Sequence, residues 1–161
     1  TDDTGNHLAL VHRDVTPHNV MISFDGEVKL LDFGIAKART QAERTRSGVL
    51  KGKYAYMSPE QLAGKKISGQ SDLFSLGVMM YQMVTGEVPF KGDSMATLMY
   101  KITNEQHASP DTINPQVPRC VCIIINRAME KDTRKRYKTG MQMAEDIGKC
   151  QKIIAAERRG R

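Results

Sequence analysis

Three oxygen-bearing side chains near the start of the sequence flank a predicted β-hairpin. Asp14 and Asn19 precede the hairpin in the segment HRDVTPHN, and Asp32 follows its second strand in the tripeptide DFG. We expect the hairpin to bring Asn19 and Asp32 together, and an amide oxygen beside a carboxylate suits Mg²⁺. Asp14 lies on the loop that faces the same place, where its carboxylate can accept or orient the proton of a substrate hydroxyl. The spacing therefore predicts a metal site with a general base beside it.

The elements that must position these residues are two short strands and a polar loop. Strands are predicted at residues 20–24 and 28–31, because the pair Asp25-Gly26 between them favours a two-residue turn in which both positions have positive φ. The loop before the first strand contains Pro17, which prevents it from continuing as a helix or a central strand. Asn19 is therefore predicted at the start of one strand and Asp32 at the end of its partner.

The remainder of the sequence is predicted to be a long loop followed mainly by helices. Residues 35–57 are rich in Arg, Thr, Ser, Gly and Lys without a sustained period, and long loops of this kind are usually functional. The predicted helical segments are 60–63, 72–85, 94–104, 119–130 and 139–157. Segment 72–85 is apolar on all sides, which predicts a buried central helix. A small β element followed by helices indicates an α+β fold.

The composition favours one soluble globular domain and disfavours several other classes. The 161 residues are 40% hydrophobic and 26% charged, and no apolar stretch reaches the length of a membrane-spanning helix. The net charge of +6 comes from scattered residues without interleaved aromatic side chains, so nucleic-acid binding is not expected. The three cysteines Cys120, Cys122 and Cys150 form an odd set without metal-ligand spacing. We expect all three to be thiols in a reducing, cytoplasmic compartment.

Taken together, these motifs resemble the protein kinase family, and among its members the eukaryotic-like serine/threonine kinases of bacteria. His12-Arg13-Asp14 with Asn19 is similar to the catalytic loop H-R-D-x-x-x-x-N, and DFG follows one hairpin later. Three further segments are similar to the family in the family's order: GKYAYMSPEQ (52–61), SDLFSLGVMMYQMVTGEVPF (71–90) and KDTRKRY (131–137). Ser58 stands where the family usually has Ala in its A-P-E element.

The resemblance implies a fold and a reaction. The chain would be the C-terminal lobe of a kinase, from the catalytic loop onward, with residues 1–157 in the lobe and residues 158–161 forming a basic tail. The reaction would transfer the γ-phosphate of ATP to Ser or Thr hydroxyls of a protein substrate. Asp14 would act as base, and Asn19 and Asp32 would hold Mg²⁺, with Mn²⁺ as an alternative. Serine/threonine specificity is favoured over tyrosine because the chain has Pro17 and no Trp.

The resemblance also implies structural roles for residues outside the metal site. Glu60 would pair with Arg136, Asp72 would accept hydrogen bonds from the backbone of the catalytic loop, and Met21 would lie at the adenine site. His12 and Phe33 would pack in the hydrophobic spine of the family, beside Gly34.

Two positions depart from the family pattern. The family usually has Lys two residues after the catalytic Asp and Thr after the Gly that opens the substrate-binding loop, whereas this chain has Thr16 and Lys53. We hypothesise that the two residues are exchanged across Asp14, so that Lys53 supplies the ammonium and Thr16 the hydroxyl. The alternative is that Lys53 is a solvated cation and the protein is catalytically impaired.

Arg13 precedes the catalytic Asp, and in the family this arrangement accompanies control by phosphorylation of the activation loop. Thr45 and Ser47 are the candidate phosphorylation sites, and the alternative is that both hydroxyls are merely solvated.

The sequence lacks a G-x-G-x-x-G loop with a following lysine strand, so we expect the N-lobe of the kinase to be absent and the isolated chain to be inactive. The resemblance leaves a membrane tether outside the catalytic domain of the parent protein as an alternative. A pseudokinase or a partner-binding scaffold is the alternative function. A small-molecule phosphotransferase is disfavoured, since those enzymes lack the long activation segment and the Pro59-Glu60 element.

Overall fold

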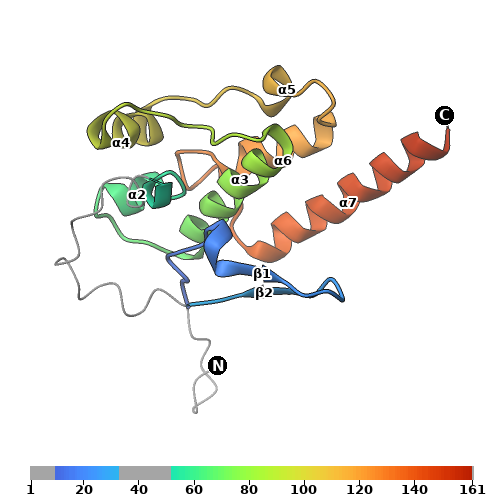
Figure 1. The fold of residues 1–161 in the computed structure, drawn as a ribbon, viewed down its shortest axis with the longest axis horizontal. Coiled ribbons are helices and arrows are strands. Elements are labelled where there is room, and N and C mark those ends of the chain that lie inside the picture. Colours follow the sequence, from blue (N-terminus) through green and yellow to red (C-terminus); the bar gives the residue numbers. More distant parts are fainter. Residues whose placement is uncertain (1–9, 33–51, 161) are drawn as a thin grey trace, which may run out of the picture.

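The computed structural model of the chain describes residues 10–32 and 52–160. Within these ranges a small antiparallel hairpin lies beneath a helical body, and the last helix extends away from that body toward the C-terminus (Figure 1). The predicted α+β fold is confirmed.

The hairpin follows a single turn of 3-10 helix, η1 (Pro17–Asn19), and consists of β1 (Val20–Ile22) and β2 (Val28–Leu30). Val20 pairs with Leu30 and Ile22 pairs with Val28. The predicted two-residue turn is wrong, because the strands end earlier and residues 23–27 connect them. Only Gly26 in this connection has a positive φ, and its N–H donates to the carbonyl of Ser23 at 3.0 Å. A longer connection still returns the chain antiparallel, so Asn19 and Asp32 flank the hairpin as expected.

Six α-helices, α2 to α7, make up the helical body in the described ranges. They are α2 (Pro59–Leu62), α3 (Gly69–Thr85), α4 (Met95–Asn104), α5 (Pro110–Ile113), α6 (Arg119–Ala128) and α7 (Gly140–Arg159). All predicted helical segments have a counterpart, and α5 was not predicted. α7 continues two residues beyond the predicted end at 157, through Arg158 and Arg159.

α3 is the central helix of the domain, and its ends are fixed by local chemistry. It begins three residues before the predicted start because Ser68 and Ser71 form a reciprocal capping box at its N-terminus. It ends at Gly86, which takes the left-handed conformation with φ of 80°. The prediction of a buried central helix is confirmed, since Phe74 and Val78 are fully buried.

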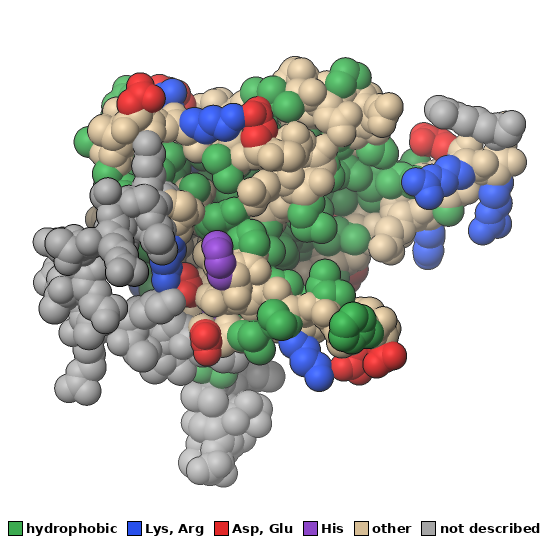
Figure 2. Space-filling view, in the orientation of Figure 1, with side chains coloured by type: hydrophobic (Ala, Val, Ile, Leu, Met, Phe, Trp, Pro, Cys, Tyr) green, Lys and Arg blue, Asp and Glu red, His purple; other side chains and the backbone are tan. Residues whose placement is uncertain are grey.

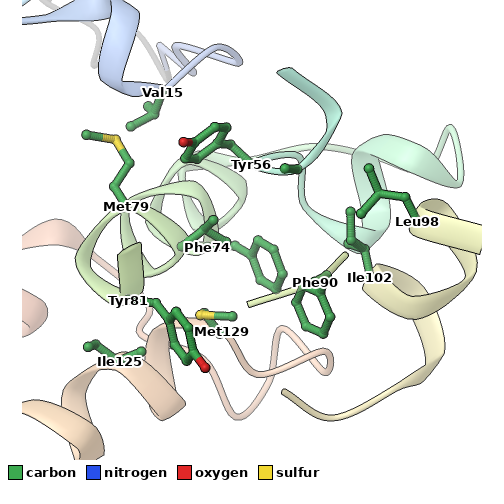
Figure 3. Packing of buried hydrophobic residues seen from close by; sticks show 12 residues of the cluster. Val15, Tyr56, Phe74, Met79, Tyr81, Phe90, Leu98, Ile102, Ile125 and Met129 are labelled. Atoms are coloured by element: carbon green, nitrogen blue, oxygen red, sulfur yellow. The ribbon is translucent and has the colours of Figure 1, made fainter. Parts of the chain in front are cut away.

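The main hydrophobic core surrounds α3 on the side of α4 and α6. Figure 3 shows Phe74 beside Phe90, Met79 beside Val15 of the loop before the hairpin, and Tyr81 beside Met129. The core therefore joins the polar loop that carries Asp14 to the helical body. Burial of this apolar surface is the main force that fixes the loop relative to α3.

A second cluster of buried residues joins α3, α6 and α7. Its members are Leu73, Ile124, Ala128, Tyr137, Met143 and Cys150. Cys120 and Cys150 form a disulfide, so the prediction of three thiols is wrong for two of them, and Cys122 alone is a free cysteine. Pairing depends on which helices pack together, and residue spacing does not contain that information.

Among the residues that the structure describes, no helix combines the length and the apolar composition that crossing a membrane would require.

Candidate active site

Asp72, near the N-terminus of α3, fixes the backbone of the HRD segment. Its two carboxylate oxygens accept hydrogen bonds from the N–H groups of His12 at 2.7 Å and Arg13 at 2.8 Å. Arg13 has a φ of 67°, in the left-handed region that non-glycine residues seldom adopt. The paired charge-assisted hydrogen bonds stabilise this strained turn, which directs Asp14 into the domain. Asp72 therefore has the contacts that the sequence analysis expected.

The loop is tied to the hairpin through two hydrogen bonds of Leu31. The Nε2 atom of His12 donates to the carbonyl oxygen of Leu31 at 2.8 Å, and the Leu31 N–H donates to the carbonyl oxygen of Asn19 at 2.8 Å. Asp32 follows Leu31 directly and has a φ of 53°. These bonds join the His12 side chain and the backbone of Asn19 to Leu31, so the chain reaches Asp32 next to the HRD segment.

Asp14 is the centre of the site. It is 5% exposed, and its carboxylate accepts hydrogen bonds from Asn19 Nδ2 at 3.0 Å and from Lys53 Nζ at 2.8 Å. Asn19 Nδ2 also donates to the Asp14 carbonyl oxygen at 2.7 Å, which fixes the amide with its oxygen available on the other side. The Lys53 side chain is 29% exposed and also lies 2.8 Å from the second carboxylate oxygen. A nearly buried carboxylate is thus held between an amide and an ammonium.

A small cavity beside Asp14 brings the two exchanged residues together. Its lining includes Arg13, Asp14, Thr16 and Lys53, with Gln61 of α2 at its side. Thr16 is buried, and its carbonyl oxygen accepts the Asn19 N–H at 3.0 Å. The expected proximity of Thr16 and Lys53 to Asp14 is therefore present in the fold.

Glu60 and Arg136 form a buried ion pair between α2 and the segment before α7. Arg136 donates to the two carboxylate oxygens of Glu60 at 2.7 and 3.2 Å, and Ser71 donates to the same carboxylate at 2.7 Å. Burial alone would raise the pKa of Glu60, but the hydrogen bonds from Arg136 and Ser71 outweigh it and hold that pKa below its ordinary value. The pair anticipated from the sequence is present, and it ties the segment around α2 to the helical body.

Comparison with known proteins identifies the family. The family model described as the protein kinase domain matches residues 6–147, which is most of the chain. The chain belongs to the protein kinase family. The resemblance inferred from the motifs is therefore confirmed. Members of this family use ATP and a divalent metal ion to phosphorylate proteins.

The kinase domain is similar to several bacterial kinases. It is 40% identical over 143 residues to a probable serine/threonine-protein kinase of Clostridium perfringens, covering 89% of this chain and 21% of the relative. It is 37% identical over 147 residues to the tyrosine-protein kinase MasK of Myxococcus xanthus, covering 91% and 23%. It is 38% identical over 138 residues to the serine/threonine-protein kinase PrkC of Bacillus subtilis, covering 86% and 21%. The chain thus spans about a fifth of the length of these relatives.

The residues available for a metal ion fit the hard cation that kinases use. Within 10–32 and 52–160, no group of three or more His, Cys, Asp or Glu side chains is arranged to hold a metal. A kinase does not need such a cluster, since one carboxylate and one amide oxygen bind the ion together with phosphate oxygens and water. Asn19 and Asp32, which flank the hairpin, are the residues that would provide this oxygen pair.

Several predicted residues lie at the edge of the described part or outside it. Phe33, Gly34, Thr45 and Ser47 fall outside the described residues. Met21 is 55% exposed on the hairpin. Figure 2 shows hydrophobic side chains at the surface over β1 and β2.

Two site residues were missed by the sequence analysis. Gln61 Nε2 donates to the carbonyl oxygen of Arg13 at 3.0 Å, so α2 supports the catalytic loop directly. Gln61 also forms a capping box with Ser58, and the pattern Ser58-x-x-Gln61 could have indicated a helix start here. The second missed residue is Gln70, whose carbonyl oxygen accepts a hydrogen bond from Arg136 at 2.7 Å. Its role depends on a contact between residues 66 positions apart and leaves no local signal.

Proposed function

We propose that this chain is the C-terminal lobe, residues 1–157, of a serine/threonine protein kinase that transfers the γ-phosphate of ATP to hydroxyl groups of protein substrates. The observation that supports this most directly is the buried Asp14, held by Asn19 and Lys53 in a loop whose backbone is fixed by Asp72. ATP and protein substrates of this kind are cytoplasmic, so we assign the lobe to that compartment.

Asp14 is the proposed base. Its carboxylate orients the substrate hydroxyl and accepts its proton as the oxygen attacks phosphorus. Asn19 holds the loop through its Nδ2 hydrogen bonds, and these leave its Oδ1 atom as the metal ligand beside Asp32. Mg²⁺ bound by Asn19 and Asp32 would neutralise charge on the phosphate oxygens. Burial of Asp14 strengthens its interaction with the attacking hydroxyl, since the local dielectric is lower than that of water.

Lys53 is proposed to replace the lysine that the family usually has at the position of Thr16. The 2.8 Å contacts between its ammonium and the Asp14 carboxylate support this role, because they hold a positive charge beside the proposed base. Thr16 lines the same cavity and would supply the hydroxyl. The ammonium is partly exposed, so it can leave one carboxylate oxygen and reach a phosphate without unfolding the loop.

The exchange is tested with Lys53→Ala, Thr16→Lys and the double variant in an intact kinase that contains this lobe. Loss of about 10²-fold in kcat is expected for Lys53→Ala, as for removal of one donor that stabilises transition-state charge. The double variant should recover part of this loss, because it restores an ammonium at position 16. Near-normal phosphotransfer by Lys53→Ala would refute the exchange.

The hairpin surface supports the proposal that an N-lobe covers this lobe in the working enzyme. Met21 is 55% exposed on one face of the hairpin, and Ile22 and Val28, which pair with each other on the opposite face, are 68% and 69% exposed. Both faces of the hairpin therefore have exposed apolar side chains, which an N-lobe with ATP beneath it would cover. The isolated chain is therefore proposed to bind ATP weakly and to lack turnover.

A groove beside Lys53 supports a polypeptide substrate. It has a volume of about 460 Å³, and its lining includes Gly52, Tyr56, Phe90 and Leu98. The Tyr56 hydroxyl donates to Gln82 Oε1 at 2.5 Å on the same wall. An extended segment of a substrate could lie in this groove with its hydroxyl directed at Asp14.

The function is tested by phosphotransfer from radiolabelled ATP to a mixture of proteins, using the intact kinase and its Asp14→Asn variant. Activity that is lost with Asp14→Asn, accompanied by phosphoserine and phosphothreonine after hydrolysis, is the expected result. If phosphotyrosine were the sole product, the lobe would have tyrosine specificity, as the name of the Myxococcus relative indicates for that protein. Partner binding with no ATP-dependent labelling of any protein would favour the pseudokinase alternative.

Control by phosphorylation is proposed for Thr45 and Ser47, with Arg13 as the side chain that receives the phosphate. Arg13 is exposed beside the site, which supports this role. Mass mapping after incubation of the intact kinase with ATP tests it, and absence of phosphate at both positions in a fully active enzyme would refute it.

A further inference from the structure

The disulfide between Cys120 and Cys150 is the one covalent crosslink in the described part of the chain. Cys120 lies at the start of α6 and Cys150 in the middle of α7, 30 residues apart in sequence and 5.5 Å apart between Cα atoms. This distance lies in the range that a disulfide requires without backbone movement. The packing of α6 against α7 therefore accommodates this bond.

Geometry selects this pair over the third cysteine. Cys122 is two residues from Cys120 on α6, and positions two apart on a helix point to different faces. Cys122 is 4% exposed, and burial raises the pKa of its thiol above the ordinary value. It faces Asp111 and Ser109 in and before α5 rather than α7. Cys122 is therefore an internal control for the chemistry of the other two.

The crosslink lies at the point where α7 leaves the helical body. Before Cys150, α7 is held by Met143 in the buried cluster and by Asp146, which accepts hydrogen bonds from Tyr137 at 3.1 Å and Arg127 at 3.2 Å. After Cys150, residues 151–160 are exposed except Ile154, which is partly buried. Figure 1 shows this last part of α7 extending beyond the other helices. Cys150 is thus the last firm attachment of the helix.

We propose that the Cys120–Cys150 pair is a reversible redox crosslink that controls the attachment of the distal half of α7 to α6. With the bond formed, residues 151–159 continue as a helix fixed at its base. With the bond reduced, Ile154 is the one partly buried side chain that attaches this segment among the described residues, so its helix frays. Disulfides in reducing compartments are usually transient and redox-sensing, which is the behaviour assigned to this pair. The proposal does not depend on phosphotransfer.

The exchange reaction begins at Cys120, because Cys120 is partly exposed and Cys150 is 4% exposed. A thiolate of a dithiol reductant attacks Cys120 Sγ, a mixed disulfide forms, and the electron pair of the broken bond leaves on Cys150 Sγ, which takes up a proton. The second thiolate of the reductant then attacks the reductant sulfur that is bonded to Cys120. The reductant becomes a cyclic disulfide, and Cys120 leaves as a thiolate that takes up a proton. The net change is two protein thiols formed and one dithiol oxidised. Oxidation follows the reverse course with glutathione disulfide, which leaves as two glutathione thiols.

The crosslink and its effect on stability are tested with the 161-residue chain after incubation with glutathione disulfide or with dithiothreitol. The oxidised chain should be two hydrogens lighter and should yield a peptide that joins Cys120 to Cys150. Its melting temperature should exceed that of the reduced chain by roughly 10 °C, from the loop entropy of a 30-residue separation. Cys120→Ala and Cys150→Ala should each abolish the difference between the two conditions, whereas Cys122→Ala should retain it. Equal melting temperatures in the two conditions, or a crosslink that involves Cys122, would overturn the proposal.

The effect on α7 and the order of exchange need two further measurements. Hydrogen exchange of residues 151–159 should accelerate on reduction, while α4 should not change. Cys150→Ala treated with glutathione disulfide should carry glutathione on Cys120, and Cys120→Ala should carry none on Cys150 in the same time. Unchanged exchange at 151–159 would show that the bond does not control the helix. Faster modification at Cys150 would overturn the assigned order of attack.

Discussion

Replacing Arg136 by Met should destabilise the kinase lobe far more than the removal of an exposed arginine would. Arg136 is 1% exposed and donates two hydrogen bonds to Glu60, one to the carbonyl oxygen of Gln70 and one to that of Glu130. Methionine fills the space beside Phe74 but donates no hydrogen bond. The variant therefore leaves Glu60 buried as a carboxylate, with a backbone N–H and the Ser71 hydroxyl as its remaining hydrogen-bond donors.

The loss in free energy of unfolding arises because the Glu60 carboxylate stays buried without its arginine partner. Removal of one partner of a buried ion pair costs about 3–5 kcal/mol, a large part of the roughly 5–15 kcal/mol that holds a domain folded. With a urea m-value of about 2 kcal/mol/M, the unfolding midpoint should fall by roughly 2 M. The matched control is Arg134→Met, because Arg134 pairs with Asp132 while its own side chain is 87% exposed. Exposed ion pairs contribute little to stability, so this control should hardly move the midpoint.

The pH dependence of the free energy of unfolding distinguishes the effect of an unpaired Glu60 carboxylate from the effect of lost packing. In the wild type the pKa of Glu60 is lowered, so its stabilising contribution is present above about pH 4.5 and is lost as the pH falls through the folded-state pKa. In Arg136→Met, burial without the arginine raises that pKa, so the folded variant favours the protonated acid. The variant should therefore lose more free energy of unfolding at pH 7 than at pH 5. A loss below 1 kcal/mol at pH 7, or one that is equal at both pH values, would refute this reasoning. Glu60→Gln added to Arg136→Met should recover part of the loss.

Three further predictions concern the catalytic loop, a buried histidine and helix packing. Asp72→Asn exchanges one of two acceptor oxygens for a donor, so phosphotransfer by the intact kinase should fall about 10-fold or more, from a loss of roughly 1.5–3 kcal/mol in hydrogen bonding. Burial lowers the pKa of His107, so stability should decline as the pH falls below about 6.5, and His107→Leu should flatten urea midpoints measured between pH 7.5 and pH 5. Gly77→Ala would place a Cβ 2.8 Å from Ala128 and should cost about 1–3 kcal/mol, whereas the unobstructed Gly148→Ala in α7 should stabilise by about 0.5–1 kcal/mol in the same urea titration.

The residue types and their order in the sequence were sufficient to predict the family, the catalytic loop and most helices. Asp14, Asn19 and Asp32 are close in sequence, so a short hairpin is enough to bring their backbones together, and the motif contains most of the necessary information. Helix α3 was predicted from its apolar residues and the glycine that follows it. Its start was misplaced because the Ser68 capping box lies outside the apolar run. The hairpin turn was misassigned because Asp25-Gly26 is compatible with both a two-residue turn and the longer connection that the strands adopt.

The tertiary structure decided the contacts between residues that are distant along the chain. Lys53 could be suspected from the sequence, but its 2.8 Å contact with Asp14 depends on the position of a segment 39 residues away. The disulfide between Cys120 and Cys150 was missed because residue spacing alone does not indicate that α6 and α7 pack with these positions in register. Local patterns determine secondary structure because helix and strand preferences act over a few residues. Which side chains meet across the domain is determined by how the buried surfaces of the helices fit, and that is a property of the whole chain.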